Sequence, residues 1–226
     1  MAGARWLTAV VCAWLSVAAI GSAHAQCLAS NVRHKPVMHT EGPLLRTGTD
    51  APVWKRVSIG TYREELALRN ALDRAGCAQG DLAEQILARS SFQVSAQKAA
   101  LDLVVLSGRN LGVLGETARL ADIYARARAF GFRLAPAEVG PQLRLQYFDQ
   151  PVGEVLHVGM DPLTTWTGRP VIFVVANGAE GLMLIGQDVA AGDVPSSIRF
   201  LFVRPTELAA GVCPACAAVT REAAPQ

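Results

Sequence analysis

The sequence lacks the short motifs that identify common catalytic and cofactor sites. It has no Gly-x-Gly-x-x-Gly stretch, no Walker lysine after a glycine-rich loop, no His-Glu-x-x-His pattern and no nucleophile elbow. Each of these motifs places a phosphate, a zinc ion or an activated serine at a fixed point of a fold. Their absence argues against nucleotide binding, zinc proteolysis and α/β-hydrolase chemistry. We therefore predict no cofactor and no metal site.

An excess of charge of either sign is also missing. The chain has 21 Lys and Arg residues against 19 Asp and Glu residues. Because nucleic-acid binding requires a clustered basic face, we expect no nucleic-acid partner. Beyond the first 25 residues, no apolar run reaches the roughly 20 residues that a membrane-spanning helix needs. We expect no membrane span once that first segment is removed.

The first 25 residues have the pattern of a secretory signal peptide. Arg5 precedes an apolar run from Trp6 to Ile20, and Ala23 and Ala25 form the small-x-small pattern that a signal peptidase recognises. We predict cleavage after Ala25 and a periplasmic or secreted mature protein. About 200 residues would remain, which is enough for one domain with its own core.

Cysteine usage fits an oxidising compartment. Cys12 would leave with the signal peptide, and Cys27, Cys77, Cys213 and Cys216 would remain. Four cysteines allow three pairings, of which we favour Cys27 with Cys77 and Cys213 with Cys216. Loop-closure entropy gives about 4 kcal/mol of stabilisation for the first bridge and about 2 kcal/mol for the second. The Cys-Pro-Ala-Cys spacing of the second pair is also that of thiol oxidoreductases, so a redox function is one alternative.

The remaining chain divides into three parts by composition. Residues 26–56 contain three scattered prolines and no hydrophobic period, which predicts an irregular N-terminal arm. Residues 57–204 have regular patterns and form the predicted domain. Residues 205–226 form an alanine-rich, loose C-terminal tail with the Cys-x-x-Cys pair.

The first half of the domain has mainly helical patterns. Thr61 and Glu64 have capping-box spacing before an apolar face that ends at Gly76. A second, shorter helix begins at Asp81, a strand covers residues 101–106, and a third helix covers residues 116–130.

From Pro141 onward the hydrophobic period changes to two. Leu143, Leu145 and Tyr147 alternate with polar residues, as in a half-buried strand. Further strands are predicted over 152–160, over 171–176 and 182–186 as a hairpin at Asn177-Gly178, and over 198–203. The predicted fold is α+β: N-terminal helices packed on a C-terminal antiparallel meander, in a single domain.

A central stretch resembles an uncharacterised family of small bacterial proteins. It runs from Pro136 to Tyr147 (Pro-Ala-Glu-Val-Gly-Pro-Gln-Leu-Arg-Leu-Gln-Tyr) and continues through Asp149-Gln150-Pro151 and Gly153-Glu154. With weaker similarity on both sides, the resemblance covers about residues 57–204. It implies no activity, cofactor or binding residue, and Ala135 stands where the family often has cysteine.

The same stretch supplies the candidate ligand-binding residues. They are the charged and amide side chains Glu138, Arg144, Gln146, Asp149, Gln150 and Glu154. A guanidinium beside carboxylates and amides can bind a carboxylate or sugar hydroxyls, and paired carboxylates can act as general acid and base. Cross-strand salt bridges that lock a hairpin would produce the same pattern, so the sequence leaves all three interpretations open.

We expect an exported, non-catalytic binding or interaction protein of the cell envelope. Its partner would be an unknown small molecule or another envelope protein. The main alternative is an envelope hydrolase that uses carboxylates of residues 138–154. The second alternative is a thiol-redox protein that uses Cys213 and Cys216.

Overall fold

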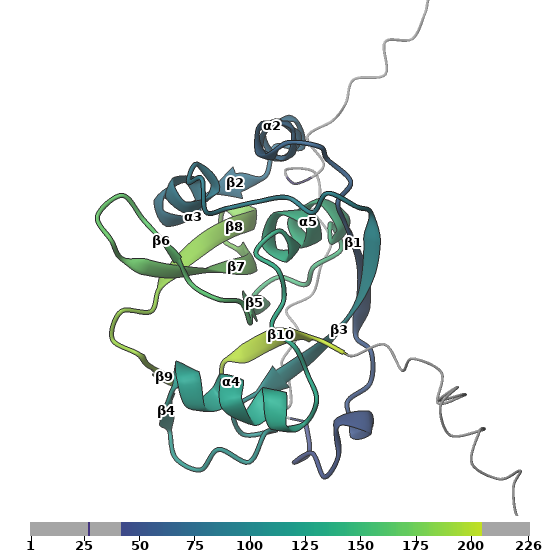
Figure 1. Ribbon diagram of the computed structural model, residues 1–226, viewed down its shortest axis with the longest axis vertical. Helices are drawn as coiled ribbons and strands as arrows, with labels where there is room; N and C mark the ends of the chain where they lie inside the picture. Colours follow the sequence, from purple (N-terminus) through teal and green to yellow (C-terminus); the bar gives the residue numbers. More distant parts are fainter. Residues whose placement is uncertain (1–26, 28–41, 205–226) are drawn as a thin grey trace, which may run out of the picture.

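The computed structural model describes Cys27 and residues 42–204 (Figure 1). Short helices alternate with strands along this part of the chain. The helices are η2 (a 3-10 turn, Gly48–Asp50), α2 (Glu65–Arg74), α3 (Asp81–Leu87), α4 (Leu120–Ala129) and α5 (Val139–Gln146). The strands are β1 (Lys55–Ile59), β2 (Ala78–Gln79), β3 (Ala99–Ser107), β4 (Thr117–Arg119), β5 (Val155–Val158), β6 (Leu163–Thr164), β7 (Pro170–Gly178), β8 (Gly181–Asp188), β9 (Asp193–Pro195) and β10 (Arg199–Val203).

One eight-stranded mixed sheet forms the body of the protein. Its order is β1-β3-β10-β5-β7-β8-β2, with β6 paired to β7 outside this path. The β10–β5 and β8–β2 pairs are parallel and the other pairs are antiparallel. Strands β4 and β9 form a separate two-stranded sheet. The large sheet is curled into a half-barrel (Figure 1).

The predicted fold class was therefore wrong. Strands β1 and β2 come from the first half of the chain, where only the strand that corresponds to β3 was expected, and the sheet is mixed instead of an antiparallel meander. The central position of β10 explains the difference. This last strand lies between β3 and β5, so the C-terminal half closes around a strand from the N-terminal half. Pairings this distant in sequence leave no local signal.

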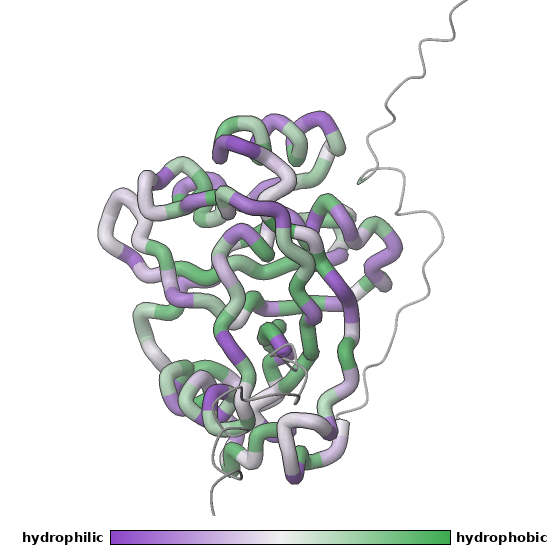
Figure 2. The backbone as a smooth tube through the Cα atoms, turned by 45° about the vertical axis from the view of Figure 1, so that its right-hand side comes forward, coloured by the Kyte–Doolittle hydropathy of each residue, from purple (hydrophilic) through white to green (hydrophobic). Residues whose placement is uncertain are grey.

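Helix α5 lies inside the curve of the sheet. It contacts β1 on one side, β7 and β8 on the other, and α2 above (Figure 1). The approach to β7 requires a glycine, because a Cβ atom at Gly140 would lie 2.7 Å from Cβ of Phe173. Figure 2 shows hydrophobic backbone stretches crossing the middle of the body. The sheet and α5 thus enclose one hydrophobic core.

The strand predicted from Pro141 was also wrong, since these residues belong to α5. The alternation of polar and apolar residues suggested one exposed face. In the structure Gln142 and Arg144 are as deeply buried as Leu143. These polar side chains face other polar groups inside the protein. The alternation of polar and apolar residues therefore does not correspond to an alternation of exposed and buried side chains. A helical signal was present in Glu138, Gln142 and Gln146, which are spaced by four.

Two other helix predictions need correction. Helix α2 begins at Glu65 after an N-cap at Glu64 that makes no side-chain capping bond. Thr61, the predicted cap, instead donates its hydroxyl to Gln142 Oε1 at 3.0 Å. Helix α4 begins at Leu120 instead of residue 116, because residues 117–119 pair with β9 as a strand.

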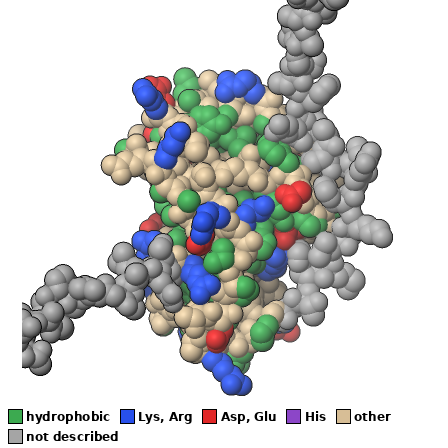
Figure 3. Space-filling model, turned by 90° about the vertical axis from the view of Figure 1, so that its right-hand side faces the viewer, with side chains coloured by type: hydrophobic (Ala, Val, Ile, Leu, Met, Phe, Trp, Pro, Cys, Tyr) green, Lys and Arg blue, Asp and Glu red, His purple; other side chains and the backbone are tan. Residues whose placement is uncertain are grey.

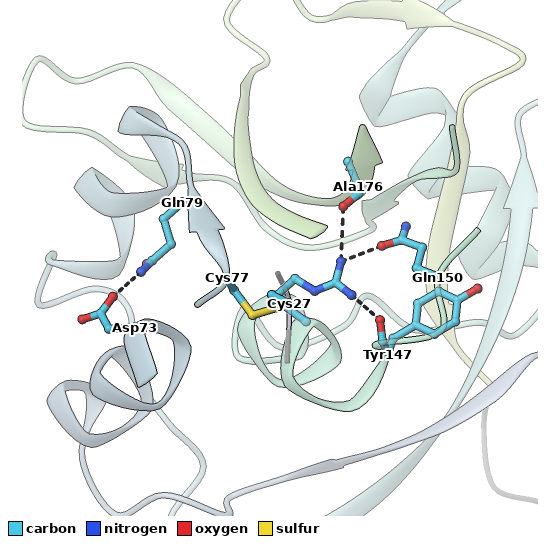
Figure 4. The surroundings of a disulfide bond; sticks show 8 residues. Cys27, Asp73, Cys77, Gln79, Tyr147, Gln150 and Ala176 are labelled. Atoms are coloured by element: carbon cyan, nitrogen blue, oxygen red, sulfur yellow. Dashed lines mark hydrogen bonds between the residues drawn. A yellow bond between two sulfur atoms is a disulfide. The ribbon is translucent and has the colours of Figure 1, made fainter. Parts of the chain in front are cut away.

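The β7–β8 hairpin and the Cys27–Cys77 disulfide were predicted correctly. The hairpin turns between Gly178 and Gly181, two residues later than predicted, and Asn177 belongs to β7. Figure 4 shows the disulfide between Cys27 and Cys77. The N–H of Cys27 also donates to the Ala75 carbonyl at the end of α2, at 2.9 Å. Cys213 and Cys216 lie outside the described residues.

Among the helices described over residues 42–204, none has the length and apolarity needed to cross a bilayer.

Candidate functional site

Five of the six candidate residues of the central stretch belong to two hydrogen-bonded clusters around α5, and Asp149 lies outside both. The first is a stripe along one side of the helix, made by Glu138, Gln142 and Gln146. Gln142 Nε2 donates to Glu138 Oε1 at 2.8 Å, and Gln146 Nε2 donates to Gln142 Oε1 at 3.1 Å. The members stand four residues apart, which is one helical turn, so each reaches the next.

This stripe binds the backbone of β1, of Gly60 directly after β1 and of Ser95 shortly before β3. Gln146 exchanges two hydrogen bonds with the backbone of Ser58, at 2.9 and 2.8 Å. Glu138 accepts the N–H of Gly60 at 2.7 Å on one oxygen and the N–H of Ser95 at 2.7 Å on the other. Since β1 is an edge strand of the large sheet, the stripe covers an edge that would otherwise be open to another strand.

The second cluster surrounds Arg144, which is completely buried. Its guanidinium donates to Gln150 Oε1 at 2.6 Å, to the carbonyl of Ala176 at 3.2 Å and to the carbonyl of Tyr147. Figure 4 shows these three acceptors converging on one point. Burial lowers the pKa of Arg144 to about 10, against the opposing effects of Tyr147 and Glu154.

Gln150 and Glu154 extend this cluster to the sheet. Gln150 Nε2 donates to the carbonyls of Glu154 at 3.2 Å and Val175 at 3.1 Å. Glu154 is only 2% exposed, and its two oxygens accept the Tyr147 hydroxyl at 2.7 Å and Arg199 Nη1 at 3.1 Å. Burial, followed by the hydrogen bond to Glu154, raises the pKa of Tyr147. These side chains join the turn after α5 to β7 and β10.

Asp149 differs from the other five candidates because it lies at the surface. Its side chain is 75% exposed and stands 4.0 Å from Lys55 Nζ on β1. Lys55 in turn lies over the ring of Tyr147, 4.5 Å from its centroid. A second ion pair, between Arg56 and Asp102, joins β1 to β3. Figure 3, which views the molecule from this side, shows basic and acidic side chains close together.

The structure thus places Glu138 and Glu154 in different clusters and Asp149 outside both. Each buried carboxylate accepts hydrogen bonds from protein groups on both of its oxygens. Each is therefore held in one position, where it joins α5 and its turn to neighbouring strands. Within the described part of the chain, no three His, Cys, Asp or Glu residues lie close enough to hold a metal ion.

Two surface hollows lie away from the central stretch. The larger, of about 700 Å³, lies along α4 and the loop before β4, with Gly112, Ala118, Ala125 and Ala129 among its lining residues. The smaller, of about 490 Å³, lies between α2 and the end of α3. Its lining residues are Glu65, Leu66, Arg69, Leu87, Ala88, Arg89, Ser90, Phe92 and Gln93.

Next to the smaller hollow stands an exposed tryptophan that the sequence analysis missed. Trp166 is 64% exposed, and the Arg89 guanidinium lies 4.3 Å from the centroid of its ring. Sequence alone could have drawn attention to Thr-Thr-Trp-Thr-Gly, a tryptophan among turn-forming residues. Its pairing with Arg89, 77 residues earlier by numbering, required the fold.

Comparisons of the chain with protein-family models, curated proteins and solved structures found no match.

Proposed function

We propose that this chain is an exported, non-catalytic binding or interaction protein of the cell envelope. The main support is the burial and the hydrogen bonding of the two carboxylates Glu138 and Glu154. Glu138 and Glu154 are almost fully buried, and each already holds two elements together through hydrogen bonds. A general acid or base must reach the proton that it transfers, which a carboxylate in this setting does not do without opening the core.

Export is supported by the sequence pattern of residues 1–25 and by the buried Cys27–Cys77 bridge, which persists best in an oxidising compartment. Binding is supported by two open hollows with mixed polar and apolar linings. In this proposal the central motif is the scaffold, and the ligand meets the protein elsewhere.

The test has two stages. First, the protein is recovered from its native host after thiols are trapped by alkylation at lysis, and its intact mass and cell fraction are determined. We expect a chain that begins at Gln26, is found outside the cytoplasm and has Cys27 and Cys77 unalkylated. A cytoplasmic protein with alkylated Cys27 and Cys77 would contradict export.

Second, the purified protein is exposed to a panel of envelope compounds, including oligosaccharides, peptidoglycan fragments and amino acids. Melting temperature and product formation are measured in parallel. A compound that raises the melting temperature and is recovered unchanged supports binding. Turnover that Glu138→Gln or Glu154→Gln abolishes, while the variant stays folded, would support the hydrolase instead.

A further inference from the structure

The loop between β6 and β7 holds Trp166 at the surface in a fixed position. The N–H of Thr165 donates to the Arg169 carbonyl at 2.9 Å, and the N–H of Arg169 donates to the Thr165 hydroxyl at 3.1 Å. Gly168 closes the turn with a positive φ of 81° and donates to the Thr165 carbonyl at 3.1 Å. Thr165 itself is buried. An indole presented in this way loses little entropy when it binds a ligand.

Arg89 is positioned by the same aromatic ring. It follows the end of α3, and its guanidinium stacks on Trp166 at 4.3 Å from the centroid. No acidic side chain among residues 42–204 forms an ion pair with Arg89 or with Arg69 on α2. Both arginines line the hollow between α2 and α3, with Ser90 and Gln93. Two guanidinium groups thus line one hollow, and one of them, that of Arg89, lies over an exposed indole.

From this arrangement we infer that the Trp166–Arg89 face binds an acidic carbohydrate, a glycan that carries carboxylate groups. A sugar ring would pack on the exposed part of the Trp166 indole. Its carboxylate would accept hydrogen bonds from Arg89 or Arg69, since guanidinium and carboxylate match in shape and charge. The hydroxyl of Ser90 and the amide of Gln93 supply further donors and acceptors for sugar hydroxyls.

The size and the polar groups of the hollow fit a small charged ligand. The hollow is lined by Leu66 together with Glu65, Arg69 and Arg89, and Trp166 contacts Arg89. A volume of about 490 Å³ falls within the range of small-ligand sites. The inference rests on the proposed binding function and names its ligand class.

The probe for the test is tetragalacturonate, with maltotetraose as its uncharged counterpart. Binding is followed by titration calorimetry and by the indole N–H signal of Trp166 in a ¹H–¹⁵N spectrum. We expect the Trp166 signal to shift with tetragalacturonate, the affinity to fall with added salt, and maltotetraose to bind about ten-fold more weakly or not at all.

Variants separate this face from the rest of the surface. Trp166→Ala and Arg89→Ala should each weaken binding about ten-fold, while Trp166→Phe keeps part of the affinity. Matched controls are Val53→Ala for an exposed apolar residue and Arg128→Ala for an exposed cation, and neither should change the affinity. Melting temperatures check that every variant is folded.

Three outcomes would overturn the inference: no shift of the Trp166 signal at millimolar tetragalacturonate, equal affinity for maltotetraose, or binding that Trp166→Ala leaves unchanged. If tetragalacturonate gives one of these outcomes while another compound class binds elsewhere on the protein, the inference fails and the proposed function stands. If tetragalacturonate is cleaved, as judged by mass spectrometry, the proposed non-catalytic function fails.

Discussion

The side-chain amide of Gln146 makes hydrogen bonds to both backbone groups of Ser58. Gln146 Oε1 accepts the Ser58 N–H at 2.9 Å, and Gln146 Nε2 donates to the Ser58 carbonyl at 2.8 Å. Ser58 is paired with Ala100 on β3, and its own N–H and carbonyl face away from that strand. A helix side chain therefore satisfies the backbone groups that a further β-strand would otherwise bind.

Replacing Gln146 by alanine should remove both of these bonds. Because the pair is partly exposed and water can replace the lost partner, we expect the free energy of unfolding to fall by only about 1 kcal/mol. Urea unfolding at pH 7 measures this change. Gln97→Ala is the matched control, since Gln97 is exposed and its side chain makes no hydrogen bond within the described residues. Equal stability of the two variants would contradict the edge-covering role of Gln146.

Glu138→Gln should be more harmful, although it changes only one atom. Both carboxylate oxygens accept a backbone N–H, from Gly60 and Ser95, so one of these donors must face the new NH₂ group. We expect a loss of about 2 kcal/mol, since the lost bonds involve a buried charged acceptor. Hydrogen exchange at Gly60 and Ser95 should also accelerate. The control Glu64→Gln alters an exposed carboxylate, and a similar loss there would contradict the prediction.

Removal of the Cys27–Cys77 bridge should destabilise the protein, because the unfolded chain gains conformational entropy when the bridge is absent. The bridge closes a loop with a sequence separation of 50 residues. Loop-closure entropy for that length predicts a loss of about 4 kcal/mol in the Cys27→Ala/Cys77→Ala variant, measured by urea unfolding without reductant. The Cys213→Ala/Cys216→Ala variant should lose about 2 kcal/mol at most. An unchanged midpoint after removal of the first pair would contradict the prediction.

His157 should make the protein less stable in mild acid. Burial lowers its pKa from 6.5 to about 4, against the opposing effects of the Gln187 side chain and the Arg199 backbone. Between pH 6.5 and 4 the unfolded chain binds a proton that the folded protein does not, so stability falls as the pH decreases through this range. The full effect would be roughly 3 kcal/mol.

Urea unfolding of the native protein and of His157→Gln at pH 7 and pH 4.5 isolates this contribution. Carboxylates titrate in both proteins, and only the native chain carries the histidine. We expect the native protein to lose more stability than His157→Gln between the two pH values. An equal loss would mean that His157 is protonated as readily in the folded state as in the unfolded chain.

Local patterns were sufficient to predict several elements. The helix at Asp81, the strand around Leu103 and the β7–β8 hairpin were each found from periodicity and turn residues. The Cys27–Cys77 pair was favoured among the three pairings that four cysteines allow. These features depend on residues that are close in sequence or on a very small number of possible pairings.

The candidate site shows where local patterns were insufficient. Glu138, Arg144 and Glu154 were predicted as ligand-binding candidates, but whether their side chains face solvent could not be deduced from residue type. Their burial follows from partners such as Ser95, Ala176 and Arg199, which lie between 32 and 45 residues away by numbering. The face formed by Arg89 and Trp166 was missed for the same reason.

The sequence by itself determined short-range features of this protein: its main hairpin, the helix at Asp81 and the presence of polar side chains in the central stretch that need hydrogen-bond partners. It limited the cysteine pairing to three possibilities. The tertiary structure decided that residues 139–146 form a helix inside a curled sheet instead of a strand within it. The physical reason is that a buried polar side chain is tolerated only where donors and acceptors converge on it. For Glu138 and Arg144, that convergence comes from strands and loops distant in sequence.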